Sequence, residues 1–273
     1  MPDSNDSLNE AFRIDGRVAV VTGAVGILGS VYCRALAEGG ATVVVSDLDQ
    51  EKCDAFAAEL PGDQPHIGLA VDLSSEEAIV AWATRINEQF GAADILVNNA
   101  ATKTPNLFNP LPEFPLEDWK MSLDVNLTAV FLAVRELGPA MVEKGKGSII
   151  NIASIYGVVG PDQRIYEGSY YEAVGGPISS PFVYSAAKGA IVAMTKYLAT
   201  YWGDKGVRTN TITPGGVGSG QNNTFTDKYS SRVPMGRMAE ANELGGALLY
   251  LASDASSYVN GHNLVVDGGW TAW

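Results

Sequence analysis

Short apolar runs rich in valine and isoleucine recur along the chain and alternate with amphipathic stretches. The short runs are mostly continuous, which is typical of strands buried on both faces of a sheet. The predicted strands are residues 18–22, 42–46, 67–71, 94–98, 148–153, 208–213 and 263–266. The helical patterns between them cover residues 27–39, 51–60, 75–90, 117–143, 184–203 and 240–252.

This alternation of strand and helix predicts an α/β fold. The expected architecture is a doubly wound, Rossmann-like parallel sheet of about seven strands with helices on both faces. Two stretches rich in Gly, Pro, Ser and Asn, 156–183 and 214–238, interrupt the rhythm. Both follow predicted strands, so we expect them at the carboxyl edge of the sheet, where such folds bind ligands.

Composition and length favour one soluble domain. The chain has 273 residues, of which 46% are hydrophobic and 18% charged. We interpret residues 1–12 as a flexible tail and residues 13–273 as a single domain with an insertion at 157–182 and a substrate loop at 214–238. The tail lacks the basic and apolar regions of a signal peptide, and no stretch is long and apolar enough to span a bilayer, so we expect a cytoplasmic protein.

The charge of the chain argues against several partners. The net charge of -13 disfavours nucleic acid and anionic membrane surfaces. The chain has two cysteines, Cys33 and Cys53, which alone cannot form a disulfide framework or a metal cage, and we expect no metal site. A small-molecule substrate is therefore the expected partner.

The stretch "VTGAVGILGS" follows the first predicted strand and contains Gly23, Gly26 and Gly29. Its glycines are spaced by three and three, whereas the dinucleotide fingerprint spaces them by two and three. A helix N-terminus here would offer N–H groups to a pyrophosphate. Taken alone, the stretch fits either that site or a tight turn between strand and helix.

Asp47, at the end of the second predicted strand, favours the cofactor interpretation. It lies 24 residues beyond Gly23, near where an acidic residue accepts hydrogen bonds from the adenosine ribose. No Lys or Arg stands between Ser46 and Gln50 to bind a 2′-phosphate, which favours NAD over NADP. Asp72 is a weaker candidate for the adenine edge. The alternative for Asp47 is a solvated strand end or a helix cap.

The sequence "YSAAK" places Tyr184 and Lys188 four residues apart at the start of a strong helical pattern. Side chains at that spacing share one face of a helix. An ammonium near a phenol favours the phenolate and lowers its pKa from about 10. The pair is a plausible general acid/base for interconverting an alcohol and a ketone, although the pattern is common.

Taken in order, the motifs resemble those of the short-chain dehydrogenase/reductase family along nearly the whole chain. They include "VTGAVGILG", "VDL", "NNAA", "DVNL", "NIAS", "YSAAK", "PGGV" and "NGHNLVVDGGW". The resemblance implies that Tyr184 is the acid/base and that Lys188 holds the nicotinamide ribose. It further implies that Ser154 hydrogen-bonds the reacting oxygen and that Asn126 holds a water in a proton relay from Lys188.

The same resemblance implies a set of cofactor-binding residues at the carboxyl edge of the sheet. They are Gly23, Val25, Gly26, Ile27, Leu28, Asp47, Leu48, Asp72, Leu73, Asn99, Ala100, Ala101, Tyr184, Lys188, Pro214, Gly215 and Val217. It also implies self-association as a dimer or tetramer through the predicted helices 117–143 and 184–203. The second of these carries apolar residues on more than one side, as in a core or an interface.

The chain departs from the single-domain branch of the family at three places. The middle glycine is Gly26, one place early, with Ile27 at the usual position, so we expect Gly26 to make the close approach to the pyrophosphate. The spacing resembles that of the extended branch. Ala101 replaces a glycine. Ser154 and Tyr184 are 30 residues apart, much more than usual.

The extra residues between Ser154 and Tyr184 are polar and aromatic. They include Asp162, Gln163, Arg164, Tyr166, Glu167, Tyr170, Tyr171 and Glu172. Such a wall suits a hydroxyl-rich substrate, and the alternative is a solvated surface flap. The insertion and the ending "DGGWTAW" also look like those of members found in the biosynthesis of nonulosonate sugars such as legionaminic acid.

These observations predict an NAD-dependent oxidoreductase acting on a secondary alcohol or ketone of a sugar, polyol or sugar derivative. Three alternatives stay open from the sequence. One is an NAD-retaining epimerase or dehydratase of a sugar nucleotide, suggested by the glycine spacing. The others are a reductase of 3-oxoacyl thioesters and a non-catalytic NAD-binding protein, the last disfavoured because the Tyr184–Lys188 pair is present.

Overall fold

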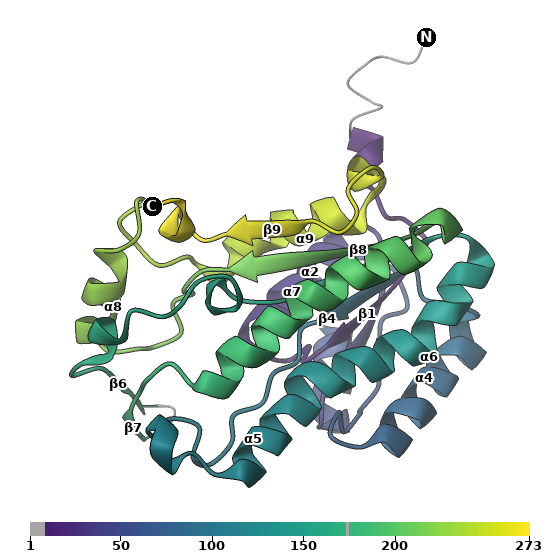
Figure 1. Ribbon diagram of the computed structural model, residues 1–273. Helices are drawn as coiled ribbons and strands as arrows, with labels where there is room; N and C mark the ends of the chain where they lie inside the picture. The colour runs from purple at the N-terminus through teal and green to yellow at the C-terminus, as the bar shows by residue number, and fades with distance from the viewer. Residues whose placement is uncertain (1–8, 173–174) are drawn as a thin grey trace.

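The computed structural model describes residues 9–172 and 175–273. Seven strands form one parallel sheet in the order β3-β2-β1-β4-β5-β8-β9 (Figure 1). They are β1 (Val18–Thr22), β2 (Thr42–Ser46), β3 (Ile67–Gly68), β4 (Ile95–Asn98), β5 (Gly147–Ile152), β8 (Val207–Pro214) and β9 (Asn263–Val266). The chain adds strands outward from β1 in one direction and then returns to add β4 on its other side. This is the predicted doubly wound arrangement, with its switch point between β1 and β4.

Helices cover both faces of the sheet. They are α2 (Ile27–Glu38), α3 (Gln50–Ala58), α4 (Glu76–Phe90), α5 (Leu116–Leu123), α6 (Ala129–Lys144), α7 (Phe182–Trp202), α8 (Asn223–Ser230) and α9 (Gly245–Ala252). In Figure 1, α4, α6 and α7 lie in front of the sheet, and α2 and α9 lie behind it. The predicted Rossmann-like fold is confirmed.

The sheet has a hydrophobic core on each of its faces, because successive side chains of a strand point to opposite faces. In β1, Ala19 and Val21 pack into the core beneath α2, whereas Val20 packs into the core on the opposite face. All three side chains are fully buried. A strand covered on both faces needs apolar residues at every position, which explains the continuous apolar runs in the sequence.

Two elements differ from the sequence prediction. The third strand ends at Gly68 rather than 71, yet the chain continues beside β2, where the Leu69 N–H donates to the Val45 carbonyl at 2.9 Å. Helix α8 lies inside the predicted loop 214–238. It begins because the Asn222 side chain accepts a hydrogen bond from the Phe225 N–H at 3.1 Å.

The predicted helix 117–143 is one continuous helical segment with a π-helical turn, Asp124–Thr128, between α5 and α6. By length and composition alone, the helix of residues 116–144 could cross a membrane, since its most apolar 18-residue window has a mean hydropathy of 1.3, so the expectation of no such stretch was wrong. Half of the most apolar window is buried inside the molecule, where α6 packs on α4 and α5 packs on α7. This is the environment of a core helix.

The structure describes only part of the predicted tail and of the predicted insertion. Residues 1–8 of the predicted tail and residues 173–174 of the predicted insertion lie outside the described residues, and residues 9–12 are helical. The rest of the insertion holds a small antiparallel hairpin, β6 (Tyr170–Tyr171) and β7 (Gly176–Pro177). The insertion packs against α8 through a hydrophobic cluster that includes Ile165, Phe225 and Tyr229.

The turn from β1 into α2 requires glycine at two of its three glycine positions. Gly23 has a φ of 63°, and a Cβ there would lie 2.7 Å from the Ala100 Cα. A Cβ on Gly29 would lie 2.0 Å from the Gly23 carbonyl oxygen. At Gly26 the φ is -75° and a Cβ would meet that oxygen at 3.3 Å. Packing therefore excludes side chains at Gly23 and Gly29 and only crowds one at Gly26.

This difference predicts unequal effects of two matched substitutions. Gly29→Ala should lower the free energy of unfolding by about 1–3 kcal/mol, because the new methyl group must displace backbone. Gly26→Ala, which adds the same atoms three residues earlier, should cost clearly less. Chemical denaturation of the two variants measures both values. Equal losses, or a larger loss for Gly26→Ala, would contradict this account of the turn.

Candidate active site

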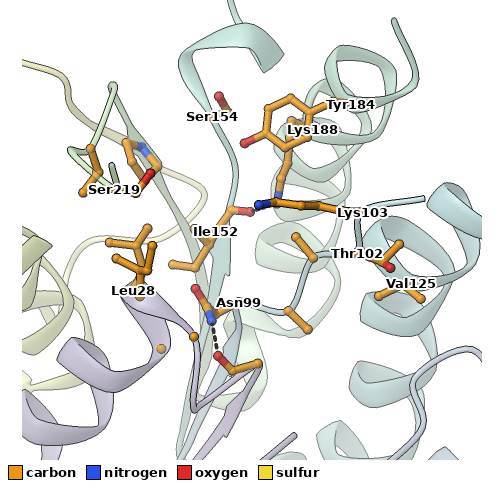
Figure 2. Close-up of a pocket in the computed structure, with 18 of the residues that line it drawn as sticks. Leu28, Asn99, Thr102, Lys103, Val125, Ile152, Ser154, Tyr184, Lys188 and Ser219 are labelled. Carbon is orange, nitrogen blue, oxygen red and sulfur yellow. Dashed lines mark hydrogen bonds between the residues drawn. The ribbon is translucent and has the colours of Figure 1, made fainter. Parts of the chain in front are cut away.

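A cavity of about 960 Å³ opens at the carboxyl edge of the sheet. It extends from the turn after β1 past the ends of β2 and β3 on one side, and past β4, β5 and β8 to the start of α7 on the other. Figure 2 shows Leu28 at one wall of the cavity and Tyr184 and Lys188 at the opposite wall. The cavity thus lies at the switch point of the sheet, where ligands bind in folds of this class.

Every residue that the sequence predicted for cofactor binding lines this cavity. The lining residues from that set are Gly23, Val25, Gly26, Ile27, Leu28, Asp47, Leu48, Asp72, Leu73, Asn99, Ala100, Ala101, Tyr184, Lys188, Pro214, Gly215 and Val217. Ser154 lines it as well, whereas Asn126 does not. Residues from six strand ends and two helices therefore converge on one space long enough to hold an extended ligand.

The turn after β1 is tied to the end of β4 by side chains. The Asn99 amide donates to the carbonyls of Thr22 and Gly23, each at 3.0 Å, and Figure 2 draws one of these two bonds. In the opposite direction, the Thr22 hydroxyl accepts from the N–H groups of Asn99 and Ala100, at 3.1 and 3.2 Å. These four bonds fix the glycine-rich turn relative to the middle of the cavity.

The two carboxylates of the cavity lie beyond β2 and β3. Asp47 accepts hydrogen bonds from the backbone N–H groups of Val25 at 3.1 Å and Leu48 at 2.9 Å. Its carboxylate is therefore held against the glycine-rich turn. Asp72 is exposed and accepts from the N–H and hydroxyl of Ser74, and these bonds lower the pKa of its carboxyl group.

Ser154, Tyr184 and Lys188 come together on the other side of β1. Ser154 lies two residues beyond the end of β5 and is buried, and its hydroxyl accepts from the Tyr156 N–H at 3.3 Å. Lys188 is buried, and its ammonium donates to the Ile152 carbonyl at 2.7 Å. The same ammonium lies 5.7 Å from the centroid of the Tyr184 ring. Figure 2 shows the Tyr184 hydroxyl and Ser154 facing the same part of the cavity.

Burial sets the direction of the pKa shifts of this pair. It lowers the pKa of Lys188 to about 8, because a low-dielectric environment disfavours the ammonium. It raises the pKa of Tyr184, and a hydrogen bond with Ser154 opposes that rise. The sequence had suggested that Lys188 lowers the pKa of Tyr184. Here desolvation is the larger effect, since the ammonium is bonded to a carbonyl and lies over the ring.

A buried chain of polar side chains holds α7 against the sheet. The Asn98 amide donates to Asn151 at 2.8 Å, and the Asn151 amide donates to the Thr195 hydroxyl at 2.9 Å. The Thr211 hydroxyl donates to Thr195 at 2.7 Å. All four residues are buried. Because α7 carries both Tyr184 and Lys188, this chain of bonds also positions the catalytic candidates relative to β4, β5 and β8.

Asn126 is buried in the π-helical turn between α5 and α6. Its side-chain oxygen accepts from the Thr102 N–H at 2.9 Å. The structure therefore gives this oxygen a backbone partner in the segment after β4. Single π-helical turns of this kind are frequent at functional sites. The proton relay implied by the resemblance stays a prediction.

The polar content of the insertion is mostly directed away from the cavity. Asp162 pairs with Arg164 and Arg232 at the surface, and Tyr166 donates to the Tyr156 hydroxyl at 2.9 Å within a buried cluster. Of the eight residues expected to form a polar wall, Tyr171 alone lines the cavity. That expectation was wrong because Asp162, Arg164 and Tyr166 bond to protein neighbours. The other four residues of the set are exposed: Gln163, Glu167, Tyr170 and Glu172.

The cavity has further walls that sequence reasoning missed. They are formed by Gly29, Val71, Ser74, Thr102, Lys103, Phe108, Met121, Val125, Ile152, Ala153, Ile178, Ser179, Ser219 and Gln221. Some of these lie in the segment that follows β4, a placement that the predicted strand 94–98 implied. Others come from the insertion and the substrate loop, whose paths the sequence pattern does not specify. Within residues 9–172 and 175–273, no group of three or more His, Cys, Asp or Glu residues is arranged to hold a metal ion.

Comparison with known proteins places this arrangement in a family. Residues 17–174 match the short chain dehydrogenase family, and residues 167–271 match the family described as Enoyl-(Acyl carrier protein) reductase. D-threitol dehydrogenase of Mycolicibacterium smegmatis is 36% identical over 271 residues, which cover 97% of this chain and 96% of that protein. Galactitol 2-dehydrogenase (L-tagatose-forming) of Cereibacter sphaeroides is 35% identical over 268 residues, covering 96% and 98%.

Solved structures agree with the sequence relatives. The crystal structure of a gluconate 5-dehydrogenase from Burkholderia cenocepacia J2315, in complex with NADP and tartrate, superposes with a TM-score of 0.86 at 32% identity, covering 97% of this chain and 99% of that one. With this fold, the cavity at the switch point and these relatives, the chain belongs to the short-chain dehydrogenase/reductase family and is an NAD(P)-binding oxidoreductase that interconverts a secondary alcohol and a ketone.

Proposed function

We propose that the protein is an NAD-dependent dehydrogenase of a polyol, sugar or sugar derivative. The observation that carries the proposal is one continuous cavity with Ser154, Tyr184 and Lys188 at one end and Asp47 at the other. The relatives named for threitol, galactitol and gluconate all act on hydroxyl-rich molecules. We also propose a cytoplasmic location.

In the proposed mechanism, Tyr184 transfers the proton and Ser154 hydrogen-bonds the reacting oxygen of the substrate. Lys188 holds the nicotinamide ribose, and its ammonium is already oriented by the Ile152 carbonyl. Burial raises the pKa of Tyr184 and so favours the phenol, the form that protonates the oxygen of a ketone. In the oxidation of an alcohol, the same residue would act as the phenolate and accept the hydroxyl proton. When bound, the nicotinamide supplies the hydride acceptor and donor.

Tyr184→Phe should lower kcat by about 100- to 10,000-fold, the usual contribution of a general acid/base, while NAD binding is retained. Steady-state rates together with a calorimetric titration of NAD measure the two effects. Tyr166→Phe is the matched control, since it removes the same phenol oxygen from a residue that does not line the cavity. Retained turnover in Tyr184→Phe would refute the assignment.

The preference for NAD rests on the end of the cavity beyond β2. The Asp47 carboxylate faces the glycine-rich turn, and the cations that line the cavity, Lys103 and Lys188, both lie on the other side of β1. A 2′-phosphate would meet a like charge there. We further propose that the pyrophosphate closely approaches the backbone at Gly26, the position where packing would only crowd a side chain.

Asp47→Ser should raise the ratio of kcat/KM for NADP to that for NAD by about 10- to 100-fold, because it removes the repulsion of a 2′-phosphate. Asp72→Asn is the control, since it removes the same charge from the same end of the cavity and should leave the ratio unchanged. Steady-state kinetics with each cofactor provide the ratios. A wild-type enzyme that prefers NADP would overturn the proposal for NAD without affecting the assignment of Tyr184.

We propose that the protein forms a dimer or tetramer through α5, α6 and α7. These helices expose large apolar side chains, with exposed fractions of 51% for Phe131, 64% for Tyr197 and 58% for Tyr201. Tyr197 and Tyr201 stack on each other with their ring centroids 5.6 Å apart. An ordered aromatic surface of this kind is typical of an interface between subunits.

Light scattering coupled to size exclusion should give a molar mass of two or four times 28.8 kDa at micromolar concentration. Tyr197→Asp should shift the population toward the monomer, because it places a charge in the apolar surface. Tyr258→Asp, which adds the same charge at a fully exposed tyrosine after α9, should not. A wild-type protein that elutes as a monomer would contradict the proposal.

A further inference from the structure

The charged groups that line the cavity are separated by sign. Asp47 and Asp72 lie beyond β2 and β3, and Lys103 and Lys188 lie on the β4 and β5 side of β1. The chain as a whole has a net charge of -13. The end of the cavity that contains Tyr184 is therefore locally cationic in a protein whose overall field repels anions.

The Lys188 ammonium donates a hydrogen bond to the Ile152 carbonyl, whereas the Lys103 ammonium has no such acceptor among the described residues. Within residues 9–172 and 175–273, no carboxylate lies within ion-pair distance of Lys103, and no backbone or side-chain acceptor bonds it. Its side chain is exposed to the cavity. Figure 2 shows it extending into the cavity from the side of Val125, Tyr184 and Lys188.

The structure around Lys103 holds it in place without neutralising it. Its ammonium lies 5.0 Å from the centroid of the Tyr171 ring, and the Tyr171 hydroxyl donates to the Ser219 carbonyl at 2.9 Å. The adjacent Thr102 N–H donates to Asn126. An aromatic face attracts an ammonium but accepts no net charge, so the N–H donors of Lys103 stay available to a ligand.

We propose that Lys103 binds a carboxylate of the substrate, so that the enzyme acts on a hydroxy acid, such as a sugar acid, rather than on a neutral polyol. This inference rests on the proposed function and names the substrate class for it. The secondary alcohol would lie at Ser154 and Tyr184 and the carboxylate at Lys103. Both groups would belong to one molecule within the same cavity.

A carboxylate fits this position better than a phosphate does. A phosphate site normally gathers several donors, such as a helix N-terminus, consecutive backbone N–H groups or arginines. No arginine lines the cavity, and Lys103 is the one lining cation, among the described residues, that has no protein acceptor. A single ammonium matches the single charge of a carboxylate.

The test compares matched acids and alcohols as substrates for NAD reduction. The pairs are gluconate with glucitol, galactonate with galactitol and threonate with threitol, and glucitol 6-phosphate serves as the phosphate arm. The wild type should have the higher kcat/KM for the acid of at least one pair. Its KM for that acid should rise with ionic strength, because screening weakens the attraction to Lys103.

Lys103→Gln should lower the ratio of kcat/KM for the acid to that for its alcohol by about 10- to 100-fold, as expected for one charge-assisted hydrogen bond. The loss should appear mainly in KM. Lys103→Arg, which keeps the charge, should retain most of the ratio. Lys205→Gln removes the same charge before β8, at the opposite edge of the sheet, and should leave the ratio unchanged.

The outcomes separate the two proposals. Turnover of the alcohols in preference to the acids, an unchanged ratio in Lys103→Gln or a preference for the phosphate would overturn the role of Lys103 and leave the proposed dehydrogenase intact. If the wild type reduces NAD with neither member of any pair, the proposed function fails on this panel and the inference fails with it.

Discussion

The hydrogen bonds that join Asn98, Asn151, Thr195 and Thr211 are the constraint on which the active site depends. They run through the interior from β4 through β5 to α7 and back to β8. Buried amides and hydroxyls must find partners, and these find them only when α7 has one position along its axis and one rotation. Lys188 lies two helical turns before Thr195, so the same bonds fix the side chains that face the reacting atoms.

A second set of contacts fixes the opposite half of the cavity. Asn99 and Thr22 join the turn after β1 to the end of β4, and Asp47 binds the Val25 N–H across the same turn. The halves share β4: its last residue, Asn98, belongs to the first network, and the next residue, Asn99, belongs to the second. The spacing between the end proposed for adenosine and the end that holds Tyr184 is therefore set by the rigid middle of the sheet.

The polar and aromatic residues of the insertion were expected to line the cavity, but most of them do not. Its backbone carbonyls attach it to α8 and the substrate loop: the Lys228 ammonium donates to the Arg164 and Glu167 carbonyls, and the Asn222 amide donates to the Gly168 carbonyl. This docking brings Tyr171 to the cavity wall, under the ammonium of Lys103. The position of Tyr171 depends on contacts with segments distant in the chain, since its hydroxyl donates to the Ser219 carbonyl and its ring contacts Lys103.

The sequence by itself determined the sheet, its order of elements and nearly all of the cofactor side of the cavity, because strand ends and glycine turns are local features with fixed spacing. Gly23, Asp47, Ser154 and Tyr184 could all be placed this way. Only the tertiary structure decided that Lys103 faces the cavity with no acceptor among the described residues, that burial raises the pKa of Tyr184 and that most of the insertion turns away. Desolvation, ion pairing and loop docking depend on neighbours distant in the chain, and no local pattern encodes them.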